Sequence, residues 1–251
     1  MPGLLIHSGD QSLAGPGVYR FEESGADIHV SLISLGDMLR QYLPEVKVAG
    51  YRTLKSRVFA AGSFGGDFLS GKEIRQVNGF KALKKQVEWI GGRFALKTLV
   101  SKVLPEAGCA GLISVAYESR GAPYLVNSPE ISISISHSGD YALAGLCSDP
   151  DIRIGLDIER IDRRGFADVM KVAFTDREIA CANNSPEEAC RMWTVKEAYL
   201  KFVKSGFRES LKRVDVSGGV IVHGGVAVAG LGVKTIRAGE RHLMSIVYNR
   251  D

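Results

Sequence analysis

The stretch ISISISHSGDYALAGLCSDPDIRIGLDIER, Ile131 to Arg160, decides the fold of this chain. Apolar and polar residues alternate along it, and short turn sequences interrupt the alternation. This pattern predicts a β-meander. The last strand, IGLDIER, is unusual for a plain scaffold because it carries two carboxylates beside a glycine.

The two carboxylates, Asp157 and Glu159, are predicted to share one face of that strand, because side chains alternate between faces. Gly155 lies on the same face and leaves room beside them. Acids at i and i+2 are close enough to share a divalent ion, and Mg²⁺ usually takes one or two carboxylates plus water and phosphate oxygens. A solvated acidic strand face is the alternative for these residues taken alone.

The composition is that of an ordinary globular protein. The 251 residues are 45% hydrophobic and 24% charged, with a formal net charge of +4. This length fits one large domain or two small ones. The small basic excess permits an anionic ligand but does not indicate nucleic acid. We expect no membrane span, because no window of the sequence is apolar enough, and no export signal, because the start lacks a basic region followed by a long apolar one. The four cysteines have neither metal-site nor disulfide spacing, which favours a cytoplasmic location.

Two helical stretches flank the meander, at residues 68–104 and 174–207. Ser70 and Thr175 each precede a glutamate by three residues, which is the sequence signature of a capping box. Ser185, followed by a proline, begins a further helix in the second stretch. Strands are expected at residues 17–24 and 26–35 and in the tail from residue 214, and a short helix at residues 36–43.

The two helical stretches resemble each other. FLSGKEI is similar to FTDREI, and WIGGRFALK is similar to WTVKEAYLK. The matched residues are Trp89, Arg93 and Lys97 in the first copy and Trp193, Glu197 and Lys201 in the second. A long-period repeat predicts an α+β fold of two similar α/β halves, residues 1–148 and 149–251, related by a pseudo-twofold axis around a cleft. Chance similarity between two amphipathic helices is the alternative.

The helix at residues 188–203 is apolar around most of its circumference, which is typical of a buried helix. Its polar residues occupy a narrow sector that contains Thr194, Glu197 and Lys201, and Lys196 is the exception. We therefore expect Glu197 and Lys201 to face the cleft. A surface Glu–Lys pair at i,i+4 is the alternative.

Candidate anion contacts occur in two places. The tetrapeptide SHSG, residues 136–139, ends a strand, where hydroxyls, an imidazole and turn amides would hold a phosphate. Basic residues cluster in the first helical stretch: Lys81, Lys84, Lys85, Arg93 and Lys97. A turn histidine and a solvated basic face are the alternatives.

The combination ISISHSGDYA, IGLDIER, FTDREI and WTVKEAYLK resembles the signature of the 4′-phosphopantetheinyl transferases. The resemblance extends from Phe68 to Phe207. The presence of two halves in one chain resembles the surfactin-synthetase-activating (Sfp-like) class.

This resemblance implies an enzyme that transfers the phosphopantetheine arm of coenzyme A to a serine of an apo acyl or peptidyl carrier protein and releases 3′,5′-ADP. It implies a monomer with coenzyme A in the cleft. Mg²⁺ would be held by Asp157, Glu159 and Glu197. Glu197 would take the serine proton, directly or through a metal-bound water, and Lys201 would neutralise or protonate the leaving group. The implied nucleotide contacts are Lys81, Lys84, Lys85, Arg93, Ser136 and His137.

The chain departs from the family pattern at two loops. Relatives often have GKP where residues 121–123 read GAP, so a lysine contact is missing at Ala122. The loop KSGFRES lacks the usual second glycine, and residues 1–67 carry no motif that assigns them a role. A metal-dependent hydrolase of coenzyme A or another nucleotide pyrophosphate and a non-catalytic coenzyme-A-binding module are the alternative functions.

Overall fold

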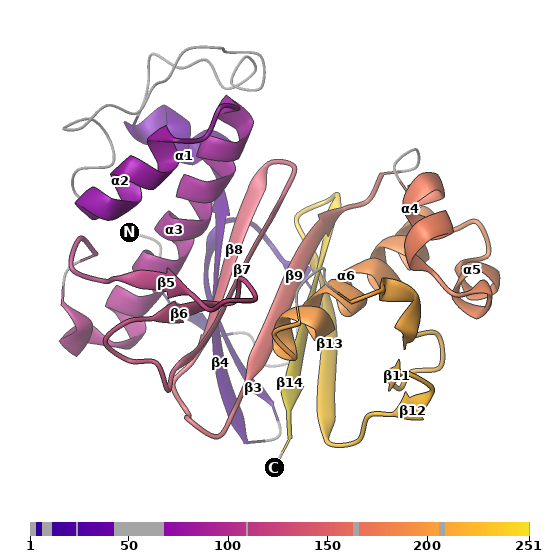
Figure 1. The fold of residues 1–251 in the computed structure, drawn as a ribbon. Helices are drawn as coiled ribbons and strands as arrows, with labels where there is room; N and C mark the ends of the chain where they lie inside the picture. The colour runs from indigo at the N-terminus through magenta and orange to yellow at the C-terminus, as the bar shows by residue number, and fades with distance from the viewer. Residues whose placement is uncertain are drawn as a thin grey trace.

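The computed structural model describes residues 4–6, 12–23, 25–42, 68–108, 110–162, 166–205 and 209–250. The fold is α+β, as predicted. Two β-sheets stand next to each other in the middle of the molecule, with helices on the outer side of each (Figure 1). No helix in these ranges is long and apolar enough to cross a membrane.

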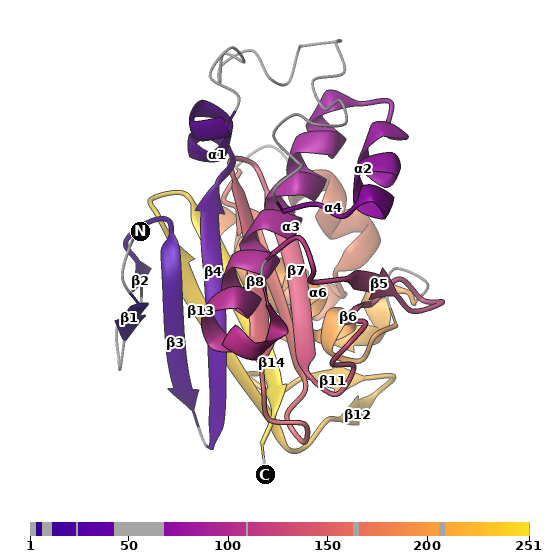
Figure 2. The same cartoon turned by 90° about the vertical axis from the view of Figure 1, so that its left-hand side faces the viewer.

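The first sheet has five strands in the order β1-β3-β4-β8-β7 (Figure 2). They are β1 Leu4–Ile6, β3 Gly17–Glu23, β4 Ala26–Ser34, β8 Tyr141–Cys147 and β7 Ser132–Ser138. The predicted strands at 17–24 and 26–35 are thus confirmed. The helices on this side are α1 Leu35–Tyr42, α2 Gly71–Asn78 and α3 Leu83–Val103, and a β-hairpin follows them, β5 Val115–Tyr117 and β6 Pro123–Leu125.

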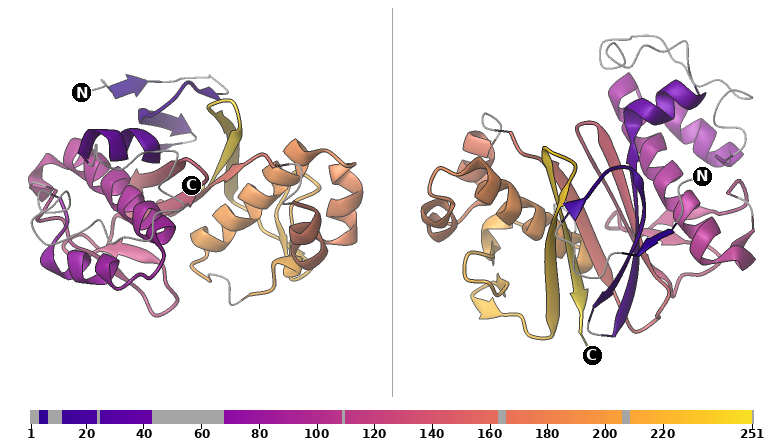
Figure 3. Two further views of the ribbon diagram at one scale, coloured as in Figure 1. Left: turned by 90° about the horizontal axis from the view of Figure 1, so that it is seen from above. Right: turned by 180° about the vertical axis from the view of Figure 1, so that it is seen from behind.

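The second sheet has four strands in the order β2-β13-β14-β9. They are β2 Ser12–Leu13, β13 Leu231–Ala238, β14 His242–Asn249 and β9 Ile154–Arg160. The helices on this side are α4 Phe166–Ala173, α5 Asp176–Ala182 and α6 Pro186–Phe202, and a small sheet adds β10 Val214–Asp215, β11 Val222–His223 and β12 Val226–Ala227. Because β2 comes from the first residues of the chain, it ties the N-terminal segment to the C-terminal sheet (Figure 3).

The two sheets are joined along β7 and β9 by serine side chains. The hydroxyls of β7 accept hydrogen bonds from alternate backbone N–H groups of β9, at 2.9, 3.0, 3.4 and 3.2 Å. The pairs run in order from Ser132–Ile154 through Ser134–Leu156 and Ser136–Ile158 to Ser138–Arg160. We call these four serines the serine seam. The alternation in SISISHS therefore builds a joint between sheets, and it does not mark a solvent-facing surface.

Both predicted capping boxes form. Ser70 and Glu73 cap α2 reciprocally, as Thr175 and Glu178 cap α5. Each capping glutamate also pairs with a buried lysine. Lys97 Nζ lies 2.7 Å from Glu73, and Lys196 Nζ lies 2.5 Å from Glu178.

The contacts of the two lysines align the two copies of the internal repeat differently from the sequence similarity. Lys97 donates to the carbonyl of Phe68, two residues before its N-cap, and Lys196 donates to the carbonyl of Ala173, in the same relation to its own N-cap. Lys97 therefore corresponds by contacts to Lys196, whereas the sequence similarity paired it with Lys201. The pairing explains why Lys196 stood among apolar residues: it is fully buried against an acid.

Candidate active site

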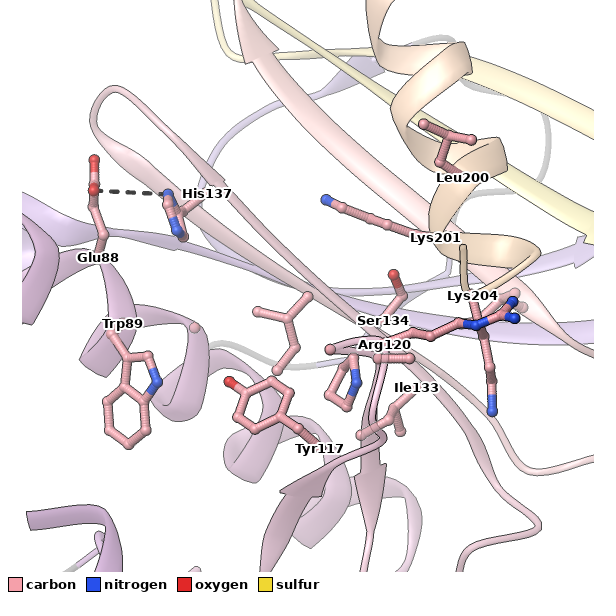
Figure 4. A pocket seen from close by; sticks show the side chains of 16 residues that line it. Glu88, Trp89, Tyr117, Arg120, Ile133, Ser134, His137, Leu200, Lys201 and Lys204 are labelled. Carbon is pink, nitrogen blue, oxygen red and sulfur yellow. Dashed lines mark ion pairs between the residues drawn. The ribbon is translucent and has the colours of Figure 1, made fainter. Parts of the chain in front are cut away.

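A pocket of about 370 Å³ opens between the two halves. Its walls come from α3, the β5–β6 hairpin, β7 and the end of α6 (Figure 4). His137 and Lys201 approach it from opposite sides (Figure 4). The predicted cleft therefore exists, and residues from both halves line it.

Asp157 is the most strongly held acid beside this pocket. It is only 3% exposed, and its Oδ1 accepts hydrogen bonds from Ser136 Oγ at 2.6 Å and Lys201 Nζ at 2.7 Å. Its Oδ2 is buried and has no hydrogen-bond partner within the described part of the chain. One oxygen is thus fixed in direction while the other remains available to a cation.

Glu159 lies two residues further along the same face of β9, as predicted. Its Oε2 accepts from Ser138 Oγ at 2.7 Å, and its Oε1 accepts from Trp193 Nε1 at 3.2 Å. Burial, followed by the negative charge of Asp157, raises the pKa of Glu159. The indole places this acid against α6.

Glu197 reaches the same region from α6. It is 5% exposed, and its Oε1 has no hydrogen-bond partner among the described residues. Burial and the charge of Asp157 raise the pKa of Glu197 to about 8, while Lys201 acts in the opposite direction. The charges of Asp157 and Lys201 both act on Glu197, which places its carboxyl group near the ion pair between these two residues.

Gly155 explains how α6 comes so close to β9. A Cβ at Gly155 would lie 2.1 Å from the carbonyl oxygen of Ala198 and 2.3 Å from the backbone nitrogen of Phe202. The glycine therefore admits the helix backbone itself. Our expectation that it leaves room for a bound ion was wrong, because the helix fills that space.

The acids suit a hard divalent cation in their chemistry. Asp157 Oδ2 and Glu197 Oε1 are buried carboxyl oxygens without a hydrogen-bond partner among the described residues. Mg²⁺ prefers oxygen ligands of this kind. Both oxygens of Glu159 already accept hydrogen bonds. In the described residues, no three His, Cys, Asp or Glu side chains are arranged to hold one metal ion. The three-carboxylate site therefore stays a prediction, with Asp157 and Glu197 the better supported ligands.

The predicted nucleotide contacts divide into two groups. His137 lines the pocket, where Glu88 Oε2 lies 3.9 Å from its Nδ1, and desolvation lowers the pKa of the imidazole. Ser136 is 7% exposed, and its hydroxyl contacts Asp157. Lys81, Lys84 and Lys85 are exposed; Lys84 lies 3.5 Å from Glu88, and Lys85 lies over the ring of Phe80.

Arg93 is not presented to the pocket. It is 2% exposed, with Nε 3.1 Å from Glu73 Oε1 and Nη2 donating to Tyr117 Oη at 2.9 Å. Its guanidinium also lies over the rings of Trp89 and Tyr117, at 4.7 and 5.1 Å. The expectation that Arg93 offers positive charge directly to the cleft is wrong for this arrangement. It braces two aromatic residues that line the pocket.

Sequence reasoning missed Tyr117 and Arg120 of the β5–β6 hairpin and Lys204, which follows α6. Tyr117 and Arg120 line the pocket from the hairpin, and Lys204 lines it from the C-terminal half. Glu88 and Trp89 line it from α3. The glycine at the hairpin turn, Gly121 with φ of 89°, was the available signal for a tight turn, but a turn does not by itself reveal what it faces.

Comparisons with known proteins agree with this chemistry. Residues 153–223 match the model of the 4′-phosphopantetheinyl transferase superfamily. A human L-aminoadipate-semialdehyde dehydrogenase-phosphopantetheinyl transferase is 26% identical over 143 residues, which are 50% of this chain and 45% of the human protein. The 4′-phosphopantetheinyl transferase HetI of Nostoc sp. is 28% identical over 160 residues, 59% of this chain and 65% of its own length.

The solved structures include a holo-(acyl-carrier-protein) synthase from Bacillus anthracis in complex with CoA (3′,5′-ADP). It is 25% identical, covers 48% of this chain and 92% of its own, and has a TM-score of 0.36. The chain spans about half the length of the human relative. Both of these relatives are named as phosphopantetheinyl transferases. The matched segment, residues 153–223, holds Asp157, Glu159, Glu197 and Lys201.

Proposed function

We propose that this protein transfers the 4′-phosphopantetheine arm of coenzyme A to a serine hydroxyl of an apo acyl or peptidyl carrier protein, releasing 3′,5′-ADP. One observation carries the proposal: Lys201 lines the pocket between the two halves and donates to Asp157 at 2.7 Å, and Glu197 precedes Lys201 by about one turn of α6. Those residues lie in the segment that matches the transferase superfamily. A polyanionic diphosphate in such a pocket needs cationic partners, and Lys201 is one of them.

The proposed reaction forms one P–O bond and breaks another. The carrier serine oxygen attacks the β-phosphorus of coenzyme A, and the bond to the 3′,5′-ADP oxygen breaks. Glu197 takes the serine proton, and Lys201 neutralises the charge that develops on the leaving phosphate. Ser136 and Trp193 hold Asp157 and Glu159 in direction, which is the positioning that phosphoryl transfer requires.

We propose that the acids act with Mg²⁺. Asp157, Glu197 and Glu159 would hold the ion, and when bound it would withdraw negative charge from the diphosphate oxygens. Two observations support this: one oxygen each of Asp157 and Glu197 has no partner among the described residues, and burial, followed by the charge of Asp157, raises the pKa of Glu197. A bound cation would favour the ionised form of Glu197, as a proton acceptor requires.

The finer predictions stay part of this proposal. They are membership of the Sfp-like class, two halves related by a pseudo-twofold axis, a monomer and a cytoplasmic location. The parallel contacts of Lys97–Glu73 and Lys196–Glu178 favour related halves. Within one chain, both walls of the pocket are already present.

The decisive experiment is a mass measurement on a panel of apo carrier proteins incubated with this protein, coenzyme A and Mg²⁺. We expect a gain of one phosphopantetheine arm, lost when Mg²⁺ is chelated and lost in Glu197→Gln. Release of 3′,5′-ADP at the same rate with no carrier present would favour the hydrolase. Tight coenzyme A binding without any turnover across the panel would favour a binding module.

A further inference from the structure

Lys204 has a backbone conformation that normally selects glycine. It follows the last turn of α6 with φ of 54°, in the left-handed region. Its N–H donates to the carbonyl of Lys201 at 3.1 Å, and the N–H of Ser205 donates to that of Leu200 at 3.1 Å. These two bonds define a helix-ending motif whose left-handed position is usually glycine. A lysine there costs stability, which points to a role for its side chain.

The Lys204 side chain reaches from the end of α6 to the β5–β6 hairpin. Its Nζ lies 2.6 Å from Glu118 Oε1, on the loop of the β5–β6 hairpin. Both side chains remain partly exposed, at 40% and 39%. Lys204 also lines the pocket itself. The ion pair therefore holds the amine at the pocket wall, where solvent and ligand both reach it.

Arg120 is the second cation on this side. It lies two residues after Glu118, lines the pocket and is exposed. Within the described ranges it makes no hydrogen bond or ion pair, so its donors are available to a ligand. Its charge also acts on the C-terminal half. The hydrogen bond from His223 is the main cause that lowers the pKa of Glu209, and the charges of Arg213 and Arg120 lower it further.

Arg120 and Lys204 lie away from Glu88, the acid of α3 that lines the pocket. In Figure 4, Arg120 and Lys204 occupy one side of the pocket and Glu88 with His137 the other. Ala122, which lines the pocket from the same hairpin, contributes no charge. Positive charge on the hairpin side of the pocket therefore comes from Arg120 and is extended by Lys204 from the opposite half.

We propose that Arg120 and Lys204 form a phosphate-binding pair at the wall of the pocket, with Glu118 holding Lys204 in place before the ligand binds. The pair would hold a phosphate of coenzyme A, so this inference rests on the proposed function. Guanidinium and ammonium groups are the side chains that recognise phosphate oxygens. The diphosphate and the 3′-phosphate offer the same chemistry, and the choice of ligand distinguishes them.

The first test measures dissociation constants of coenzyme A by calorimetry in the full chain. Arg120→Ala and Lys204→Ala are each expected to raise Kd roughly 5- to 50-fold. Arg120→Lys and Lys204→Arg should retain most of the affinity. Lys171→Ala removes an equally charged surface lysine, paired only with Asp168 in the described residues, and should leave Kd unchanged. Unchanged Kd in both alanine variants overturns the inference.

Glu118→Gln separates ligand binding from a structural role. Glutamine still accepts the hydrogen bond from Lys204 and so keeps the amine in place, but it removes the negative charge that competes with phosphate. If Lys204 contacts phosphate, Glu118→Gln therefore leaves Kd unchanged or lowers it, opposite to Lys204→Ala. If Lys204 acts only through its ion pair with Glu118, both variants weaken binding equally, and the inference falls.

Lys204→Gly makes the sharpest variant, because glycine adopts this left-handed backbone conformation without strain. Relief of the left-handed backbone should raise the melting temperature while the Kd of coenzyme A rises. Asn183→Gly is the matched control: Asn183 has φ of 45° at the end of α5, so the melting temperature should rise and Kd should stay constant. A Lys204→Gly variant that binds as tightly as the wild type contradicts the proposal.

Repeating the alanine variants with 3′-dephospho-coenzyme A identifies the phosphate. A loss of affinity that persists assigns the pair to the diphosphate, and one that disappears assigns it to the 3′-phosphate. Both results support the pair. If the wild type transfers the arm and the variants bind normally, only this inference fails; if the wild type does not bind coenzyme A, the proposed function fails with it.

Discussion

The Ser136 hydroxyl lies 2.6 Å from Asp157 Oδ1, across the joint between β7 and β9. Ser136 Oγ also accepts a hydrogen bond from the backbone N–H of Ile158, at 3.4 Å. One side chain thus joins two sheets and directs an acid of the candidate active site. The stability of the fold and the geometry of the site are connected through this serine.

Ser136→Ala should therefore affect both stability and activity. We expect unfolding free energy to fall by about 1–2 kcal/mol, because buried hydrogen-bonding groups lose their partner. Transfer activity, measured as kcat/KM for a carrier protein, should fall roughly tenfold as Asp157 loses its orientation.

Ser132→Ala is the matched control for this prediction. Ser132 belongs to the same serine seam and accepts the N–H of Ile154 at 2.9 Å, at the end of β7 remote from the acids. It should cost similar stability and leave kcat/KM nearly unchanged. Equal losses of activity in the two variants would contradict a specific role for Ser136.

Glu197→Gln should change how stability depends on pH in metal-free protein. The pKa of Glu197 is raised from 4.5 to about 8 in the folded state, so the folded protein holds this proton more tightly than the unfolded chain does. The stability that the protonated Glu197 contributes is fully present below pH 4.5 and is lost as the pH rises to about 8. The variant should therefore gain on the wild type over this window, by up to about 4 kcal/mol.

The measurement is chemical unfolding of both proteins between pH 4.5 and 8.5 in the presence of a chelator. Glu178→Gln provides the contrast, because Glu178 is fully buried against Lys196. Removing that charge leaves an unpaired buried cation and should destabilise by about 3 kcal/mol or more. A Glu197→Gln variant whose stability follows the wild type at every pH would show that Glu197 does not carry the strained charge.

Mg²⁺ should stabilise the wild type at neutral to mildly alkaline pH. A ligand that binds the folded state raises its stability by about 2.7 kcal/mol at a hundred times its Kd. The melting temperature should rise with Mg²⁺ concentration, and the rise should be lost in Asp157→Asn and Glu197→Gln. Glu188→Gln, a partly exposed acid paired with Arg191, should respond to Mg²⁺ as the wild type does.

Gly155→Ala should disrupt the site by displacing a helix. The added Cβ would lie 2.1 Å from the Ala198 carbonyl oxygen, and backbone cannot move aside as a side chain can. We expect a loss of about 3 kcal/mol or more in stability and a large loss of transfer activity, because α6 carries Glu197 and Lys201.

Gly15→Ala is the control for this substitution. A Cβ at Gly15 meets no described atom within 4 Å, so stability and activity should change little. The measurements are the unfolding free energy and kcat/KM of each variant. A stable and fully active Gly155→Ala variant would show that α6 does not need its close approach to β9.

The local elements were predictable from sequence because their causes are local. Capping boxes at Ser70 and Thr175 depend on residues three apart, and both form as expected. Alternation along IGLDIER placed Asp157 and Glu159 on one face. The pattern did not reveal the short helix α4 or the short strands β1, β2 and β5. Backbone sterics and short-range hydrogen bonds decide these features without reference to the rest of the chain.

Tertiary structure alone decided which partners these residues meet. Nothing in the sequence said that Ser136 would contact Asp157, that Gly155 would admit the backbone of α6, or that Arg93 would be buried against Glu73. Each contact joins segments 20 or more residues apart, and its energy exists only once two elements have packed together. The sequence by itself determined the acids and the strand and helix that carry them, whereas packing determined which of their oxygens are held by a partner and which have none among the described residues.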